Sequence, residues 1–186
     1  MFMRLSQLLL ATGLLFSTVS FAQSQGSFTE SRTADGVKVL KGKVPLQTLM
    51  NDSAFRWFYT GVNKYQPGSS AAVDFIKSKR TKFNVVAIGG TWDPASQDAL
   101  PKLVKILILA SYSTETIDIY GVDQKNDAGV NVPFKFKRIP TFIITREGKE
   151  VGRINGNPEG SNIETELSQI LLKATKNDKP DPAPEQ

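Results

Sequence analysis

The stretch GGTWDPASQDALP, residues 89–101, is expected to join a buried strand to a helix. Residues 83–90, FNVVAIGG, form a nearly continuous apolar run that ends in glycines, which is typical of a strand covered on both faces. Residues 102–112, KLVKILILASY, are apolar enough to predict a helix packed on the sheet. Because Asp is a favoured N-cap and Pro a favoured first helical residue, Asp93 and Pro94 predict the start of that helix.

The remaining segments alternate between strand and helix patterns, which predicts one α/β domain with a mixed sheet. A final helix is expected to begin at Ser161 as its cap, with Glu164 completing a capping box. Strands are expected at residues 37–44 (as a sheet edge), 116–123, 139–145 and 150–154, helices at 45–65 (two short or one bent), 71–79 and 163–171, and a loop or short helix at 124–137.

Three local features are those of one known family: a helix that starts after a tryptophan and carries a later proline, a strand that begins Ile-Pro-Thr, and a glycine after the next strand. The residues that carry these features are Trp92, Asp93, Pro101, Ile139, Pro140, Thr141 and Gly156. Together they resemble the thioredoxin-like superfamily over residues 83–173. The resemblance implies a thioredoxin-like α/β fold, a mixed central sheet flanked by helices, with Pro140 in the cis conformation.

The sequence departs from that family at the positions that carry its chemistry. The two redox cysteines are replaced by Asp93 and Ser96, and the buried carboxylate of the preceding strand falls at Ala87. The sequence contains no cysteine, which excludes thiol-disulfide exchange. It contains no histidine either, which removes the usual general base and the commonest zinc ligand. The protein is therefore expected to be redox-inactive, with no cofactor.

Three residues of the altered helix start have more than one interpretation. Asp93 is expected to cap the helix, and the alternative is a role in binding a cationic ligand or a metal. Ser96 is expected to be a small polar residue of the first turn, because nothing offers it the base that a nucleophile needs. Trp92 is expected either to pack inward or to lie exposed as a contact surface.

In thioredoxin-like proteins the backbone before the cis-proline can pair with an extended peptide, which needs no sulfur. The resemblance therefore implies a groove that binds a polypeptide or another partner, formed by Trp92, Asp93, Ser96, Ile139, Pro140, Thr141 and Gly156. The rim would include Lys135, Lys137 and Arg138, which alternatively belong to an edge strand with a solvated face.

Two other functions stay open at this stage. One is a structural or assembly subunit whose groove is filled by its own side chains. The other is an enzyme that uses a carboxylate or metal site, with Asp93 and Asp98 as the acids. These two lie five residues apart, roughly 140° around a helix, and are not expected to share a face.

The composition of residues 1–22 predicts export, and that of residues 176–186 predicts a disordered tail. Residues 1–22 have the basic start, apolar core and small-residue end of a cleaved signal peptide, with an uncleaved anchor as the alternative. Residues 23–36 are expected to be a flexible lead-in, 37–175 the thioredoxin-like domain and 176–186 a disordered tail. The net charge of +5 is spread along the chain. A periplasmic or secreted protein is expected, with no nucleic acid or membrane partner, and its oligomeric state stays open.

Overall fold

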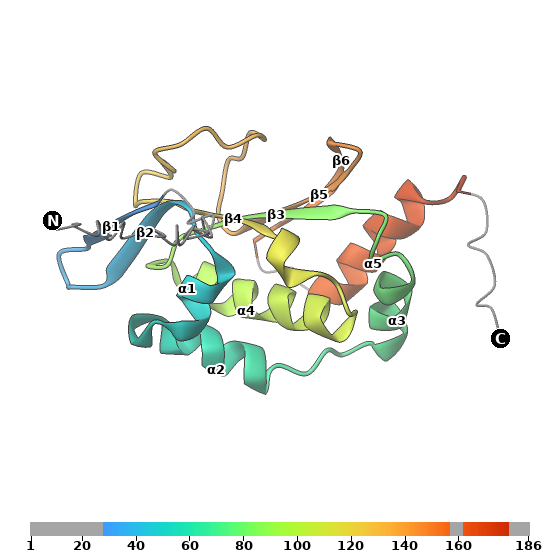
Figure 1. Ribbon diagram of the computed structural model, residues 1–186, viewed down its shortest axis with the longest axis horizontal. Helices are drawn as coiled ribbons and strands as arrows, with labels where there is room; N and C mark the ends of the chain where they lie inside the picture. Colours follow the sequence, from blue (N-terminus) through green and yellow to red (C-terminus); the bar gives the residue numbers. More distant parts are fainter. Residues whose placement is uncertain (1–27, 157–161, 179–186) are drawn as a thin grey trace, which may run out of the picture.

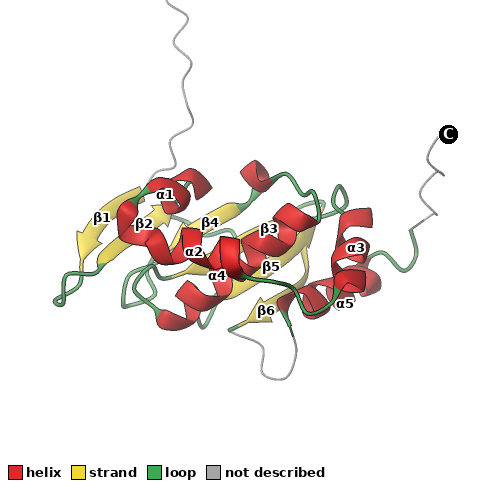
Figure 2. Ribbon diagram, turned by 90° about the horizontal axis from the view of Figure 1, so that it is seen from below, coloured by secondary structure: helices red, strands yellow, loops and turns green. Residues whose placement is uncertain are grey.

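The structure is a computed structural model that describes residues 28–156 and 162–178. Within this part of the chain a six-stranded sheet has the order β1-β2-β4-β3-β5-β6. Figure 1 shows the α-helices on one side of the sheet, and Figure 2 shows the same layer from the helical side. The fold is the predicted thioredoxin-like α/β fold.

The described chain begins with two paired strands and three α-helices, and it ends with a hairpin and a helix. The elements are β1 (Phe28–Arg32), β2 (Lys38–Lys43), α1 (Leu46–Asn51), a 3-10 turn (Ser53–Phe55), α2 (Arg56–Lys64), α3 (Ser70–Ser78), β3 (Asn84–Gly89), α4 (Pro94–Leu109), a second 3-10 turn (Thr114–Thr116), β4 (Asp118–Gly121), β5 (Thr141–Arg146), β6 (Lys149–Asn155) and α5 (Ile163–Ala174). Strands β3 and β4 are parallel, whereas β5 is antiparallel to β3 and to β6.

Strand β3 is buried on both faces, as predicted, because the sheet has a core on each side. The larger core lies under the helices, and Ala87 of β3 belongs to it. The smaller core contains Ile88 and Ile143, which are fully buried, with Phe134 and Phe136 packed against it. Residues 122–140, between β4 and β5, therefore cover the second face without forming a helix or strand (Figure 1).

The helix prediction for residues 45–65 is confirmed, and local chemistry also accounts for the start of α3 and the β5-β6 turn. Residues 45–65 form two short helices, α1 and α2, separated by a 3-10 turn. Ser69 caps α3, and its side chain accepts a hydrogen bond from the Ala72 N–H. The β5-β6 turn has Glu147 and Gly148 at φ +50° and +76°, which suits a tight hairpin.

The lead-in predicted for residues 23–36 is wrong from Phe28 onward. Residues Phe28–Arg32 form β1, which pairs with β2 in antiparallel register. Strand β1 is the sheet edge, so the prediction that residues 37–44 form the edge is also wrong. The side chains of β1 are mostly exposed, and the strand is therefore held chiefly by its backbone ladder, which leaves little apolar signal in the sequence.

The C-terminal boundary also differs from the prediction. Residues 176–178 are ordered against the domain, because the Arg146 guanidinium pairs with the Asp178 carboxylate at 2.9 Å. Helix α5 begins at Ile163 with Asn162 as its N-cap residue, and Asn162 makes no side-chain capping bond. The predicted cap, Ser161, lies outside the described residues, as do residues 1–22 and 179–186.

Glu164 makes tertiary contacts, and its predicted capping box with Ser161 lies outside the described residues. Its carboxylate is fully buried and accepts hydrogen bonds from the Tyr65 hydroxyl at 2.9 Å and from the Gly68 N–H at 2.7 Å. Glu164 therefore ties the start of α5 to the connection between α2 and α3. No helix of the described ranges is long and apolar enough to cross a membrane.

Candidate functional site

The candidate site lies where β3 ends and α4 begins, beside the first residue of β5. Asp93 caps α4 as predicted: its Oδ2 accepts hydrogen bonds from the Ser96 N–H and from the Ser96 hydroxyl, each at 2.7 Å. Pro94 is the first helical residue, where its missing N–H costs no helical bond. The start of α4 is therefore capped by a carboxylate, with no cysteine side chain involved.

Ser96 stands where the resemblance placed the second redox cysteine, and it is fully buried. Its hydroxyl donates to Asp93 and accepts from the Gly90 N–H at 3.1 Å. The predicted binding role is therefore corrected: Ser96 cannot contact a ligand, because its side chain has no exposed surface. It links the end of β3 to the helix cap instead.

Thr141 is also fully buried, which corrects its predicted place in the binding surface. Its hydroxyl lies 2.7 Å from the Arg138 carbonyl oxygen, to which it donates, and 3.2 Å from Asn155 Oδ1. Thr141 therefore fixes the backbone just before β5 and does not face solvent.

The Trp92 side chain packs inward and is half-buried. Its indole N–H donates to the Val122 carbonyl at 2.9 Å. A Cβ placed on Gly90 would lie 2.7 Å from Trp92 Nε1 and 3.2 Å from Ile139 Cδ1, so a larger residue there would require the Trp92 side chain to shift. Of the two interpretations of Trp92, the structure therefore supports the packed one.

The Ile139-Pro140 peptide bond is cis, which confirms the prediction. The Pro140 carbonyl accepts a hydrogen bond from the Gly156 N–H at 2.7 Å, and Gly156 has a φ of +71° that favours glycine. Pro140 is buried, and Ile139 is half-buried. Among the described residues, the Ile139 N–H and carbonyl have no hydrogen-bond partner.

Thr91 is a supporting residue that the sequence analysis missed. Its buried hydroxyl donates to the Lys38 carbonyl at 2.9 Å and accepts from the Leu40 N–H at 3.1 Å, which fastens the loop before α4 to β2. The Gln97 side-chain amide donates to the Thr91 carbonyl at 2.8 Å. Nothing in the local sequence distinguishes Thr91 from an ordinary loop residue.

Lys135, Lys137 and Arg138 are exposed on the segment that leads into Ile139. They do not belong to an edge strand, because residues 134–138 form no strand. No ion pair joins them to another residue in the ranges that the structure describes. The Arg153 guanidinium donates to the Lys135 carbonyl at 2.9 Å, which fastens the segment to β6.

The two acids of the enzyme hypothesis have different partners. Asp93 Oδ2 is used in the helix cap, whereas the Asp98 carboxylate pairs with Lys102 at 2.6 Å. Within residues 28–156 and 162–178, no group of three or more His, Cys, Asp or Glu residues is placed to hold a metal ion. The arrangement therefore gives no geometric support to a carboxylate or metal centre at this helix start.

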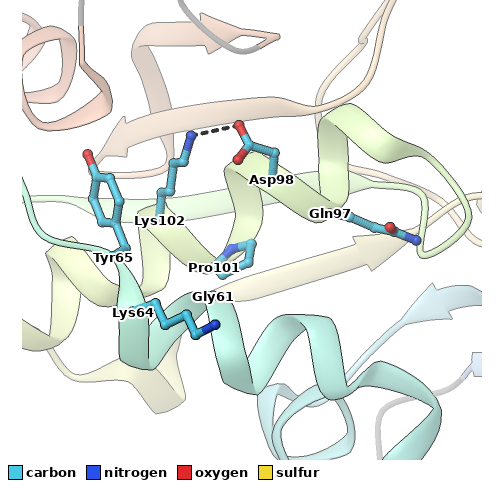
Figure 3. A pocket seen from close by; sticks show the side chains of 7 residues that line it. All are labelled: Gly61, Lys64, Tyr65, Gln97, Asp98, Pro101 and Lys102. Carbon is cyan, nitrogen blue, oxygen red and sulfur yellow. Dashed lines mark hydrogen bonds and ion pairs between the residues drawn. The ribbon is translucent and has the colours of Figure 1, made fainter.

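A separate hollow of about 240 Å³ lies between α2 and α4 (Figure 3). Its floor is the contact of Gly61 with Pro101, where a Cβ on Gly61 would lie 2.7 Å from Pro101 Cβ. The Lys102 ammonium lies 5.8 Å from the centre of the Tyr65 ring. Burial and the hydrogen bond to Glu164 raise the pKa of the Tyr65 hydroxyl, so it stays protonated at neutral pH.

Comparison of the chain with protein-family models, with curated proteins and with solved structures finds no match.

Proposed function

We propose that the protein is a redox-inactive member of the thioredoxin-like superfamily that binds an extended polypeptide segment alongside Ile139 and Pro140. The observation that carries this proposal is that the Ile139 N–H and carbonyl have no hydrogen-bond partner among residues 28–156 and 162–178. A half-exposed residue with such a backbone, two residues before β5, offers a peptide the two hydrogen bonds of strand addition.

The surroundings of Ile139 support a rigid binding edge. Residues on both sides are fixed: the Arg138 carbonyl by the Thr141 hydroxyl, and the Pro140 carbonyl by the Gly156 N–H. The Ile139 side chain lies beside Trp92 over Gly90. A preorganised edge loses little conformational freedom when it binds, which favours affinity.

The absence of cysteine makes this binding independent of redox conditions. The peptide would be held by backbone hydrogen bonds and by contact with Trp92 and Ile139, without a mixed disulfide. Dissociation would then need no reductant.

We further propose that the protein works outside the cytoplasm, in the periplasm or as a secreted protein. The support is the composition of residues 1–22, with a short basic start, an apolar core and small residues at the end. The N-terminal sequence of the protein purified from the source organism tests this, and a protein that begins at Gln23 is the expected result.

The binding proposal is tested with peptides selected from a displayed random library against the purified protein. Ile139→Pro removes the N–H donor at the binding edge, whereas Ile139→Val keeps it and is the matched control. Because one backbone hydrogen bond contributes about 0.5–1.5 kcal/mol, the Pro variant should bind about 2- to 12-fold more weakly.

The same experiment shows where the peptide binds. The Ile139 amide should become protected from hydrogen exchange when the peptide is added to the unmodified protein, and circular dichroism should show that both variants are folded. Equal affinity of the Pro and Val variants, together with an unprotected Ile139 amide, would place binding elsewhere and refute the proposal.

A further inference from the structure

We infer that the polypeptide segment bound at Ile139 and Pro140 is acidic, and that its carboxylates pair with Lys135, Lys137 and Arg138. This inference rests on the function proposed above. The three cationic side chains lie within four residues of Ile139, all are exposed, and none is in an ion pair within the described ranges.

The backbone that carries these cations is held in place on the second face of the sheet (Figure 1). Phe134 and Phe136 pack into the smaller core, which turns Lys135 and Lys137 outward. The Lys135 carbonyl accepts a hydrogen bond from Arg153. An anionic partner would therefore meet charges at fixed positions along its path.

The nearest acids of the same segment are already paired. Lys41 Nζ lies 3.0 Å from Asp123 Oδ2 and 2.6 Å from Asp127 Oδ2. This ammonium group holds the pKa of both carboxyls below their usual range, so both are ionised and both are engaged by Lys41. Asp127 also accepts the Gly129 N–H. Neither carboxylate therefore pairs with Lys135 or Lys137.

Glu150 is the acid of β6, and its carboxylate pairs with the Arg153 guanidinium. The two guanidinium nitrogens Nε and Nη2 donate to the two carboxylate oxygens, each at 2.6 Å. This bidentate pair uses both oxygens of Glu150. Glu150 is therefore not available to neutralise the cationic rim.

An acidic peptide fits this surface better than another polyanion does. Its backbone pairs with the N–H and carbonyl of Ile139, and its carboxylates meet Lys137 and Arg138 directly beside that residue. A nucleic acid or an anionic membrane would satisfy only the cations. A backbone at Ile139 and adjacent cations that have no partner within the described ranges together select an extended acidic segment.

Three labelled peptides of equal length and equal apolar content test this inference, with Glu, Gln or Lys at every second position. Their dissociation constants are measured by fluorescence anisotropy against the unmodified protein and the variant Lys137→Gln/Arg138→Gln. The control variant Lys64→Gln/Lys77→Gln removes the same charge from exposed positions on the helical side. Single-stranded DNA and phosphatidylserine vesicles serve as the other polyanions.

We expect the Glu peptide to bind about 3- to 30-fold more tightly than the Gln peptide, because each of two exposed ion pairs contributes modestly. The preference should weaken in Lys137→Gln/Arg138→Gln, where only Lys135 remains, persist undiminished in the control variant, and shrink between about 50 and about 300 mM NaCl. The Gln peptide should bind the unmodified protein and both variants alike.

Two results would overturn the inference in distinguishable ways. Equal binding of the Glu and Gln peptides would refute an acidic partner and leave peptide binding at Ile139 intact. Binding of DNA or vesicles that is lost in Lys137→Gln/Arg138→Gln, with no binding of any peptide, would refute both the acidic segment and the proposed function.

Discussion

Replacing Asp93 with alanine should destabilise the protein more than the loss of an ordinary helix cap would. The cap bond to the Ser96 N–H is worth about 1 kcal/mol. The Ser96 hydroxyl would also lose its acceptor in a fully buried position, and an unsatisfied buried polar group costs about 1–3 kcal/mol. The expected loss in the free energy of unfolding is therefore about 2–4 kcal/mol.

Urea unfolding followed by far-UV circular dichroism measures this loss, and the melting temperature should fall by about 5–15 °C for a domain of this size. Asp93→Asn is the matched control, because its amide oxygen still accepts both hydrogen bonds and Asn is a good N-cap. Its cost should stay below about 1 kcal/mol.

Asp93 and Ser96 should also be energetically coupled, because they share a hydrogen bond. Ser96→Ala alone leaves the Gly90 N–H without its acceptor. Asp93→Ala leaves the buried Ser96 hydroxyl unsatisfied, but the double variant has no hydroxyl there. The loss of unfolding free energy in the double variant should therefore be smaller than the sum of the two single losses by about 1–2 kcal/mol. A cost of Asp93→Ala within about 0.5 kcal/mol, or strict additivity, would refute the network as a source of stability.

Three further predictions concern other parts of the structure. Gly61→Ala should destabilise by about 1–3 kcal/mol in urea unfolding, because its Cβ would lie 2.7 Å from Pro101 Cβ; a gain in stability, as helix propensity alone predicts, would show that α2 and α4 shift freely. The hydrogen bond from Lys38 lowers the pKa of the Asp52 carboxyl in the folded protein. The ionised carboxylate therefore stabilises the protein fully above about pH 4, and this stabilisation is lost as the pH falls through the lowered pKa. Between about pH 6 and pH 2 the urea midpoint of Asp52→Asn should therefore fall less steeply than that of the unmodified protein. Peptide affinity should be the same with and without dithiothreitol, and a reductant-dependent affinity would contradict a binding mode free of sulfur.

The parts of the fold that were predictable are those that bury apolar side chains in a regular pattern. The run that became β3 is covered on both faces, and the Asp-Pro start of α4 needs only local capping to be recognised. Strand β1 was missed because its stability comes from backbone pairing with β2. The Asp35-Gly36 dipeptide in the connecting turn was the available signal, since Gly36 has a φ of +85°.

The candidate site was predictable in position but not in the roles of its residues. A local pattern places Ser96 and Thr141 beside the cis-proline, but burial depends on packing from distant segments, and both prove to be fully buried. The direction of Trp92 was undetermined because its partner, the Val122 carbonyl, belongs to another loop. The tertiary contacts of Glu164 with Tyr65 and Gly68 are likewise invisible in the local sequence.

A start of α4 without cysteines differs from a thiol pair in what it could contribute to the proposed binding function. A thiol pair must leave at least one sulfur accessible and must accommodate both oxidised and reduced forms. Here Asp93, Ser96 and Gly90 form a closed set of hydrogen bonds, and the second position has no exposed surface. In this loop Trp92 packs over Gly90 beside Ile139. On the proposed function, the start of α4 therefore supports the binding edge by holding Trp92 in place, and affinity would come from Ile139 and from the neighbouring segment that carries Lys137 and Arg138.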